Sequence, residues 1–413
     1  NRDILVAIFI PSYSMKSGIL GTLCCILFMA CQNKAQVKND IPVIDGMTQT
    51  KATVSELFPE TCVVPLQTSD SSLVGVMVKD LKRSGDRLFL LNQMSSRANL
   101  LCFDTTGKFV RTIDRIGHGP QEYTYLGDFV VVPDSNAWVL TTEQGKYMIF
   151  DTAGNYLSTV RQQPPYYYNR QFIRTDDSTC IVFHDGTFPE NSDLLEVDAR
   201  TFAIRRSAPA SDPLASEGTR PLSLWGGKVL YYHMNDTIYD ATDIQNRQPL
   251  YYLDFGDGQR EAEKEARRIL SESNDREQML TQLGEAFLKG EYMLVARLFE
   301  NARWIVVSGM RQNPDAGEKT DFHSSSFCIL YDKESGQSYH SDYITWDILN
   351  TGPLDNIALV GCDERGTLYA VWYGTPSEKD KRLIARSDKL PQEVKNRLLQ
   401  LEEGDNPVLF MLR

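Results

Sequence analysis

A strand-and-turn unit recurs along this chain at a nearly constant interval. The segments LLCFDTTGKFVRT and YMIFDTAGNYLST share a pattern in which Phe-Asp-Thr precedes a glycine and an aromatic residue. Their aspartates, Asp104 and Asp151, lie 47 residues apart, and Asp198 follows after another 47. Asp240 comes 42 residues further on, and Asp332 comes 92 residues after that. A period of this length predicts several copies of one folding unit.

Each copy has the features of paired β-strands. An alternating apolar strand ends at the aspartate, whose short side chain can bond backbone amides in a turn. A glycine such as Gly154 can adopt the positive φ angle that the turn needs before a second strand returns. Four antiparallel strands in about 40–50 residues make one propeller blade, and blades must stack around an axis to bury both faces. The alternative is an all-β sandwich with a chance period.

The sequence therefore predicts an all-β fold, a six-bladed β-propeller over residues 57–413. Five blades carry the aspartate, and a sixth begins at about Asp347. The early strand CVVPLQT, which starts at Cys62, is predicted to pair with the last blade and so leave no open edge. A stretch rich in Glu, Ala, Arg and Leu predicts a helical insertion within one blade, at about 259–290. A short C-terminal helix from Leu390 is predicted before the last strand.

An apolar run near the N-terminus, MKSGILGTLCCILFMACQNK, predicts export. Its apolar part, residues 19–30, holds twelve residues, whereas a helix that crosses a bilayer needs roughly 20. The run is typical of a secretory signal peptide at 15–30, with residues 1–14 as an upstream mis-start. The order of apolar residues, a small residue, Cys31 and a polar stretch resembles the lipobox of bacterial lipoproteins. This resemblance implies lipid attachment at Cys31, a flexible tether over residues 31–56 and a membrane partner. The alternative is an uncleaved N-terminal anchor.

Charge and cysteine usage narrow the range of partners. The formal net charge is −12, and so acidic a surface repels phosphate backbones, which argues against nucleic acid. No CxxC pair occurs, so neither a zinc site nor a dithiol redox motif is predicted, and no metal or other cofactor is expected. Five cysteines follow Cys31, and they are expected to be small buried residues, with one disulfide as the alternative. They are Cys62, Cys102, Cys180, Cys328 and Cys362.

Two short segments contain candidate ligand-binding residues. In PPYYYNR, the side chains of Tyr166, Tyr167 and Tyr168 offer flat apolar faces with polar tips, which suit a sugar or a protein partner. His184 and Asp185 stand where a strand meets a loop, and they are expected to line one face of the ring. The alternatives are tyrosines that pack between blades and a plain strand-end turn. No catalytic residue is predicted, because the histidines show neither HxH nor HExxH spacing.

Three segments, GDRLFLLNQ, FDTTGKFVRTIDRIGHGPQEY and YHMNDTIYD, resemble the six-bladed, NHL-like β-propeller lipoproteins of Gram-negative gut anaerobes. A Gly-x-Gly-Pro-x-Glu-Tyr turn of that family corresponds here to Gly117, Gly119, Pro120, Glu122 and Tyr123. The turn does not continue as a phosphate-binding loop, because no Gly-Lys-Ser/Thr follows it. The resemblance implies the architecture and an outer-membrane anchor that faces the periplasm, with surface exposure left open. It implies no particular chemistry.

Taken together, the sequence predicts a lipid-anchored β-propeller of the cell envelope. It is expected to act as a binding or scaffold protein for a glycan or a protein partner, without catalysis. In this fold a ligand usually sits at one end of the central channel, among loops from several blades. The alternative is a propeller enzyme, either a lyase or a metal-dependent hydrolase, with its site at one mouth of that channel.

Overall fold

Contacts divide the chain into two compact units, Asn1–Pro42 and Val43–Arg413, and every described helix and strand belongs to the second. A computed structural model gives the structure of the protein. It describes residues 41–94, 97–132, 137–142, 146–151, 153–162, 169–184, 192–209, 219–232, 236–272, 282, 293–312 and 324–413.

Five sheets have four antiparallel strands each, as propeller blades do. The first comprises β4 (Met77–Ser84), β5 (Arg87–Gln93), β6 (Ala98–Asp104) and β7 (Phe109–Ile113). The second comprises β8 (Leu126–Val132), β9 (Ala137–Thr142), β10 (Lys146–Asp151) and β11 (Tyr156–Arg161). The third comprises β12 (Asn169–Arg174), β13 (Thr179–His184), β14 (Ser192–Asp198) and β15 (Ile204–Pro209).

The other two four-stranded sheets follow later in the chain. One comprises β20 (Met293–Glu300), β21 (Trp304–Gln312), β22 (Ser324–Asp332) and β23 (Ser338–His340). The last sheet comprises β25 (Ile357–Cys362), β26 (Leu368–Trp372), β27 (Val408–Leu412) and β3 (Cys62–Pro65). The sequence predicted six four-stranded blades, and five of the sheets have that form.

A further large sheet has five strands. Its antiparallel part comprises β16 (Leu222–Trp225), β17 (Lys228–Tyr232), β18 (Thr237–Asp240) and β19 (Gln248–Asp254), and β1 (Val43–Asp45) adds to β19 in parallel. A two-stranded parallel sheet joins β2 (Ala52–Thr53) to β24 (Ile344–Thr345). In the described part of the chain the helices are α2 (Val54–Leu57), α3 (Gly256–Glu272), the 3-10 helix η2 (Ser341–Tyr343), α5 (Glu378–Ala385) and α6 (Gln392–Leu399).

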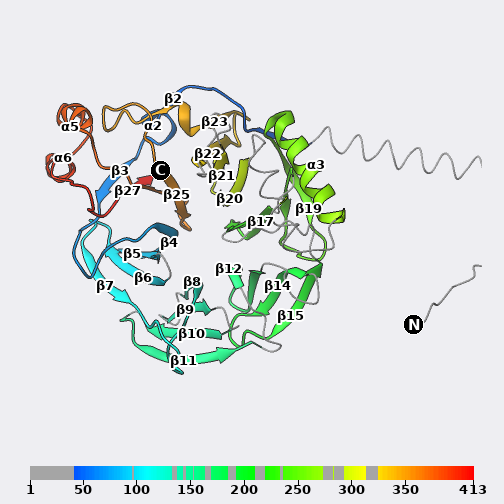
Figure 1. Ribbon diagram of the computed structural model, residues 1–413. Coiled ribbons are helices and arrows are strands. Elements are labelled where there is room, and N and C mark those ends of the chain that lie inside the picture. The colour runs from blue at the N-terminus through cyan, green and yellow to red at the C-terminus, as the bar shows by residue number, and fades with distance from the viewer. Residues whose placement is uncertain are drawn as a thin grey trace, which may run out of the picture. The chain divides into compact units, whose positions relative to one another are not determined.

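The large sheets stand around a common axis, as the β-propeller prediction requires (Figure 1). Each hydrophobic cluster joins two neighbouring sheets, so one face of each sheet is buried by the next. For example, Phe89 of β5 packs in one cluster with Phe129 of β8 and Phe150 of β10. Leu409 of β27 shares a cluster with Leu88 of β5, which joins the last sheet to the first.

The aspartate turns have the predicted construction. Oδ1 of Asp104 accepts hydrogen bonds from the backbone N–H groups of Thr106 and Lys108, at 2.9 and 3.0 Å. Asp151, at the end of β10, accepts from the backbone N–H of Asn155 at 2.8 Å. Gly154 has a φ angle of +82°, which only glycine adopts without strain. The repeat recognised in the sequence is therefore the end of the third strand, and the turn that follows it, in five of the six large sheets.

The ring is closed by strands from both ends of the described chain, as the sequence predicted. β3 pairs with β27 in antiparallel register, with Val63 opposite Phe410 and Val64 opposite Leu409. All five residues of β27 are buried. The predicted C-terminal helix is present as α6, which precedes β27.

Two predicted segments differ from the structure. The helix expected within one blade is α3, which follows the last antiparallel strand of one sheet, β19, and precedes the first strand of the next, β20. It therefore lies between two sheets and not within one. The sequence could not distinguish these positions, because the spacing between Asp240 and Asp332 is equally long wherever the insertion falls between them. Part of the expected tether, residues 31–56, is folded as β1, β2 and the first turn of α2.

All five cysteines in the described part of the chain are free thiols, and no disulfide joins them. Cys102, Cys180 and Cys328 are buried among apolar residues, as expected of small core residues. Within the described residues, no helix combines the length and the apolar character needed to cross a membrane.

Candidate functional site

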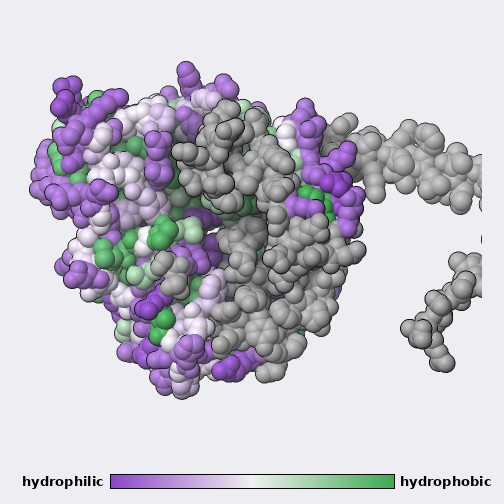
Figure 2. Space-filling view, viewed as in Figure 1, coloured by the Kyte–Doolittle hydropathy of each residue, from purple (hydrophilic) through white to green (hydrophobic). Residues whose placement is uncertain are grey.

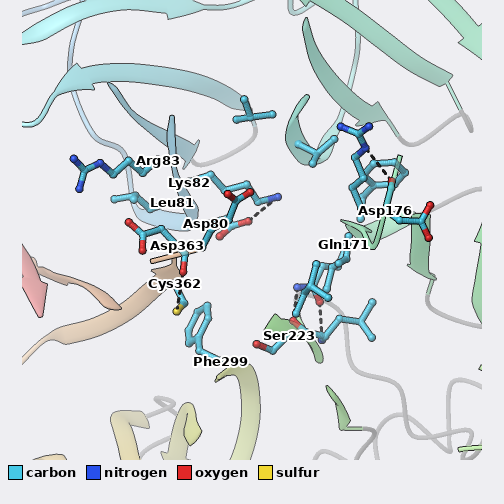
Figure 3. Close-up of a pocket in the computed structure, with 18 of the residues that line it drawn as sticks. Asp80, Leu81, Lys82, Arg83, Gln171, Asp176, Ser223, Phe299, Cys362 and Asp363 are labelled. Atoms are coloured by element: carbon cyan, nitrogen blue, oxygen red, sulfur yellow. Dashed lines mark hydrogen bonds and ion pairs between the residues drawn. The ribbon is translucent and has the colours of Figure 1, made fainter. Parts of the chain in front are cut away.

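A cavity of about 370 Å³ lies among the innermost strands of the ring (Figure 3). Every large sheet contributes to its wall, because β4, β8, β12, β16, β20 and β25 lie next to one another around the axis. The lining residues run from the middle of these strands to their ends, as in Asp80–Arg83 on β4 and Gln171–Arg174 on β12. We call this space the axial cavity.

The innermost strands share one irregularity at nearly the same place. Five of them shift register once, as at a β-bulge, a feature that can redirect a side chain. The residues after the shift are Asp80, Asp128, Gln171, Arg297 and Gly361. Directly before β16, Arg220 forms a single parallel bridge with Arg297. A polar residue therefore stands at this level in four of the six strands around the axis, and Arg220 stands at the same level just before a fifth, β16.

Four of these polar side chains and Lys82 form what we call the axial ion network. Arg220 donates to Oδ2 of Asp80 and to Oδ1 of Asp128, both at 2.7 Å. The ammonium of Lys82 lies 3.3 Å from each of the same two carboxylates. The fifth member, Arg297, donates to the backbone carbonyls of Leu359 and Val78. Asp128 is fully buried, and Arg220 is only 6% exposed, so these charges interact in a medium that screens them weakly.

The network keeps Asp128 and Arg220 ionised. Burial would raise the pKa of the Asp128 carboxyl, but Arg220 and Lys82 outweigh burial and hold that pKa below its usual value. Burial likewise disfavours the charged form of Arg220, yet Asp128 and Asp80 raise its pKa above the ordinary value. A carboxylate held in this state cannot act as a general acid near neutral pH.

Hydrogen bonds extend the network to every large sheet. Oδ2 of Asp128 accepts from the backbone N–H of Phe172 on β12, at 2.7 Å. Arg297 on β20 donates to the carbonyl of Leu359 on β25 at 2.7 Å and to that of Val78 on β4 at 2.9 Å. The network thus ties the sheets together next to the axial cavity, since Asp80 and Lys82 belong both to the network and to the cavity wall.

Several polar groups of the cavity wall already have partners within the protein. The Gln171 side chain exchanges two hydrogen bonds with the backbone of Leu222, at 2.7 and 2.8 Å. Arg174 pairs with Asp177 at 2.9 Å. The hydroxyl of Ser223 accepts from the backbone N–H of Glu300 at 2.8 Å. Hydrogen bonds within the protein therefore hold much of the wall in place. The wall presents paired charges and apolar surface, and also Asp176, Asp363 and Glu364, for which no ion pair is found among the described residues.

The apolar part of the wall comes from different sheets. Phe299 of β20 stands beside Cys362 of β25, and burial raises the pKa of the Cys362 thiol, which therefore stays protonated (Figure 3). Leu224 of β16 and Val131 of β8 are half-buried and line other parts of the wall. Among the described residues, no three His, Cys, Asp or Glu side chains come together as a metal site. The arrangement suits binding of a small molecule that is partly apolar and partly polar.

Exposed apolar side chains form a separate feature at the other end of β4. Figure 2 shows hydrophobic residues gathered over the β4 and β5 side of the face in view. Near these strands the most exposed apolar residue is Val76, at 73%, and Leu73, Met77 and Met94 are also exposed. Leu73 and Val76 lie just before β4, Met77 is its first residue, and Met94 follows β5, whereas the later part of β4 lines the cavity. This surface is therefore not part of the axial cavity.

The predicted ligand-binding residues do not line the axial cavity where they can be placed. His184 is buried at the end of β13, opposite Asn169 at the start of β12. The part of this hairpin that lines the cavity is its other end, towards the turn between β12 and β13. Asp185 and the tyrosines at 166–168 lie outside the described residues, and so does Cys31.

The sequence reasoning missed the axial ion network. A weak signal for it exists, because Asp80 and Asp128 lie 48 residues apart, close to the 47-residue period of the turns. Each is an acidic residue inside an otherwise apolar or mixed strand, a position that costs free energy unless the charge is paired. Acidic residues repeated at the blade period within strands therefore indicate a buried ionic site on the axis.

Solved structures with the same architecture include two from Bacteroides species. One is a Bacteroides fragilis protein described as a candidate exported protein, with a TM-score of 0.64 and 20% identity over 90% of this chain and 99% of that chain. The other is a member of the DUF4221 family from Bacteroides vulgatus, with a TM-score of 0.50 and 11% identity over 86% and 96%. At these identities the likeness extends to the fold alone.

No protein with a curated description matches this chain. A family model described as "Domain of unknown function (DUF4934)" matches residues 38–413. The match spans all of the large sheets, the strands that close the ring and the axial cavity. This chain therefore belongs to the DUF4934 family.

Proposed function

We propose that this protein is a non-catalytic binding protein, and that its axial cavity holds a small, polar, uncharged ligand such as part of a glycan. The observation that carries the proposal is the convergence of six innermost strands on one cavity of about 370 Å³. That volume falls within the roughly 300–1,000 Å³ of small-molecule sites. A polar wall with an aromatic ring, Phe299, is the kind of surface on which sugars bind.

The charges of the cavity wall that already have ion-pair partners favour an uncharged ligand beside them. Asp80 is paired with Arg220 and Lys82, and Arg174 is paired with Asp177. A charged ligand group would have to compete with these internal partners and would lose its own hydration. Hydroxyl groups can instead add to carboxylate and backbone oxygens that have spare lone pairs.

The proposal is tested by filling the cavity. Leu224→Trp places a large side chain on the cavity wall. The ligand is a neutral mono- or disaccharide that is selected on a glycan array. We expect the substitution to weaken its binding more than ten-fold, as measured by isothermal titration calorimetry. The matched control is Leu157→Trp, because Leu157 is 54% exposed on the outer strand β11. Equal affinity for both variants, or no saturable binding of any neutral saccharide, contradicts the proposal.

The competing function is a propeller lyase or a metal-dependent hydrolase at one mouth of the channel. At Asp176, which lines the cavity, hydrogen bonds from Ser178 lower the pKa of the carboxyl, whereas a carboxyl that donates a proton needs a raised pKa; this favours binding over general acid catalysis at that residue. Incubation of the protein with the bound saccharide, followed by mass spectrometry of the sugar, separates the two. If the wild type converts the sugar and Leu224→Trp abolishes this conversion, the protein is an enzyme and the proposed binding function is wrong.

We also propose that the ring has six blades, with β16–β19 as a blade to which β1 adds a fifth strand. Two observations support this count. The strands β16–β19 are consecutive and antiparallel, as in the four-stranded sheets. Their apolar residues also pack on both neighbours, with Tyr231 beside Phe183 of β13 and Leu253 beside Phe327 of β22. An experimental structure with β16 away from the axis would contradict the count.

We further propose that the protein is anchored in the cell envelope through a lipid on Cys31. The signal-like segment at 15–30 supports export, and the Bacteroides fragilis protein of the same fold is described as a candidate exported protein. Expressed from Met15 in a Bacteroides host, the wild type is expected to partition with the membrane and Cys31→Ser to lose most of that partitioning. Cys62→Ser is the control, because Cys62 is an exposed thiol within β3. An unmodified N-terminus by mass spectrometry would rule the lipid out.

A further inference from the structure

Exposed apolar side chains gather where the chain enters β4. Leu73, Val76 and Met77 belong to one short segment, and Met94, which follows β5, lies beside it. The two parts are in close contact, because a Cβ atom added at Gly75 would lie only 3.0 Å from Cα of Met94. Contiguous apolar surface that stays exposed marks sites of interaction on soluble proteins. We call Leu73, Val76, Met77 and Met94 the β4 patch.

The backbone beneath the β4 patch is held in place by buried side chains. The fully buried amide of Asn92 accepts from the N–H of Gly75 at 2.7 Å and donates to the carbonyl of Leu73 at 3.3 Å. Asn406, also buried, accepts from the N–H of Val74 at 2.8 Å, and the side chain of Val74 packs against the core between the last sheet and the first. The apolar side chains are therefore presented to solvent by a fixed backbone. A surface that is ordered in advance loses little conformational entropy when a partner binds.

A groove of about 650 Å³ borders the β4 patch, because Leu73 and Met94 belong to both. Its charged residues are two acids, Asp70 and Asp114, and one base, Arg97. Within the described residues, the side chains of Asp70 and Arg97 form no hydrogen bond or ion pair, and the carboxylate of Asp114 accepts only from one backbone N–H, at 3.3 Å. These charges are therefore available to a partner.

The charges favour a basic partner over a second copy of the chain or a membrane. The groove presents two carboxylates against one guanidinium, and the whole chain carries a formal net charge of −12. Two copies would bring like charges together, and a bilayer with anionic headgroups would be repelled. A segment with Lys or Arg beside apolar side chains is attracted by the same charges and can exclude water from the β4 patch. Methionines suit this role, because their flexible thioethers adapt to different apolar side chains.

We propose that the β4 patch and its groove form a docking surface for a basic, apolar segment of a partner protein. Apolar side chains of that segment would cover the four residues of the β4 patch. A Lys or Arg side chain would enter the groove towards Asp70 and Asp114. The surface lies at the other end of β4 from the axial cavity, so the proposal does not depend on the function proposed for that cavity.

Selection of short random peptides displayed on phage, with the whole protein as bait, tests the docking surface. We expect the enriched peptides to combine Lys or Arg with large apolar residues. The double variant Val76→Thr with Met94→Gln nearly keeps the side-chain sizes but makes the exposed surface more polar. It should bind the tightest selected peptide, synthesised with a fluorescent label, about ten-fold more weakly than the wild type by fluorescence anisotropy.

The matched control is Leu157→Gln, because Leu157 is 54% exposed on the outer strand β11. This variant should bind the peptide as the wild type does. No enrichment, enriched peptides without Lys or Arg, or equal affinity for the double variant and the control would overturn the proposal.

A gain of affinity provides a test that misfolding cannot imitate. Arg97→Gln removes the cation of the groove, and we expect the same basic peptide to bind this variant several-fold more tightly than the wild type. Asp70→Asn with Asp114→Asn should weaken binding and reduce its dependence on sodium chloride, because the attraction that salt screens is then lost. Unchanged or weaker binding to Arg97→Gln would count against the docking surface.

Two further measurements separate this partner from the other occupants. Both use the full chain with Cys31→Ser, so that no lipid anchor contributes. Sedimentation velocity is expected to show a monomer, and flotation with vesicles of phosphatidylglycerol and phosphatidylethanolamine is expected to leave the protein unbound. A dimer that the double variant dissociates would assign the β4 patch to a second copy, and vesicle binding that the double variant abolishes would assign it to a membrane. Either result would overturn the proposal.

Discussion

Replacing Arg220 by methionine is expected to lower the free energy of unfolding by about 3–5 kcal/mol, as is usual when one partner of a buried ion pair is removed. The substitution keeps an unbranched apolar stem but leaves Asp80 and Asp128 without their 2.7 Å partner. Lys82 remains near both carboxylates, yet its ammonium lies further away, at 3.3 Å. Urea denaturation followed by circular dichroism measures the loss.

A matched control and a rescue variant separate the ion network from simple loss of an arginine. Arg200→Met should change stability by no more than about 0.5 kcal/mol, because that side chain is exposed. Adding Asp80→Asn and Asp128→Asn to Arg220→Met should recover part of the lost stability. The two carboxylates that lose Arg220 are then replaced by neutral amides, so neither leaves an unpaired buried charge. If Arg220→Met alone stays within about 1 kcal/mol of the wild type, the network does not stabilise the ring.

The loss should depend on pH in a defined direction. Because the pKa of Asp128 is lowered in the folded protein, its contribution to stability is present above the unfolded pKa of about 3.9 and is lost as the pH falls through the folded pKa. Without Arg220, burial raises the same pKa, so the variant protonates Asp128 more readily. The difference between wild type and variant should therefore be largest near pH 7 and should shrink below about pH 4.

Local chemistry explains which parts of the fold could be predicted from the sequence. Asp104 and Asp151 act on amides within four residues of themselves, so their turns are legible in a short segment. The pairing of β3 with β27 followed from a general requirement, since a ring with unpaired strands at its ends would leave open edges. Both features depend on rules that do not need the rest of the structure.

The site could not be predicted in the same way, because its parts are far apart in the sequence. Arg220 and Asp80 are separated by 140 positions and meet only after the ring has closed. Strand patterns indicate which residues are buried, but not that a bulge turns Asp80 or Asp128 towards the axis. The prediction at His184 followed from its position at a strand end, and the structure places it at the end of β13 away from the cavity.

Removing residues 1–66 is expected to abolish cooperative folding, which is the largest effect that the structure implies. The segment 43–66, which we call the strap, crosses several sheets. β1 pairs with β19, β2 pairs with β24, and β3 pairs with β27. Between them, Phe58 packs against Trp304 with ring centroids 5.5 Å apart. The strap is thus a structural part of the ring, although its first half was expected to be a tether.

The size of the effect follows from the buried apolar surface of the strap. Seven of its residues are buried hydrophobics: Ile44, Val54, Leu57, Phe58, Val63, Val64 and Leu66. At about 1.5 kcal/mol or more for each buried side chain, their loss removes roughly 10 kcal/mol. The whole stability of a globular protein is typically only about 5–15 kcal/mol, so little would remain. Loss of β3 would also expose β27 as an open edge.

Two further truncations make this expectation decisive. A chain of residues 41–413 keeps the entire strap and should melt as sharply as the full chain, measured by circular dichroism and size-exclusion chromatography. A chain of residues 59–413 keeps β3 but loses β1, β2 and α2, and it should still fold with a lower melting temperature, because the β3–β27 pairing still closes the ring. The chain of residues 67–413 should show no cooperative transition and should aggregate through the open edge of β27. A sharp transition for residues 67–413 near that of residues 41–413 would mean that apolar packing between the sheets closes the ring without the strap. The pairing of the two chain ends would then be a consequence of ring closure and not its cause.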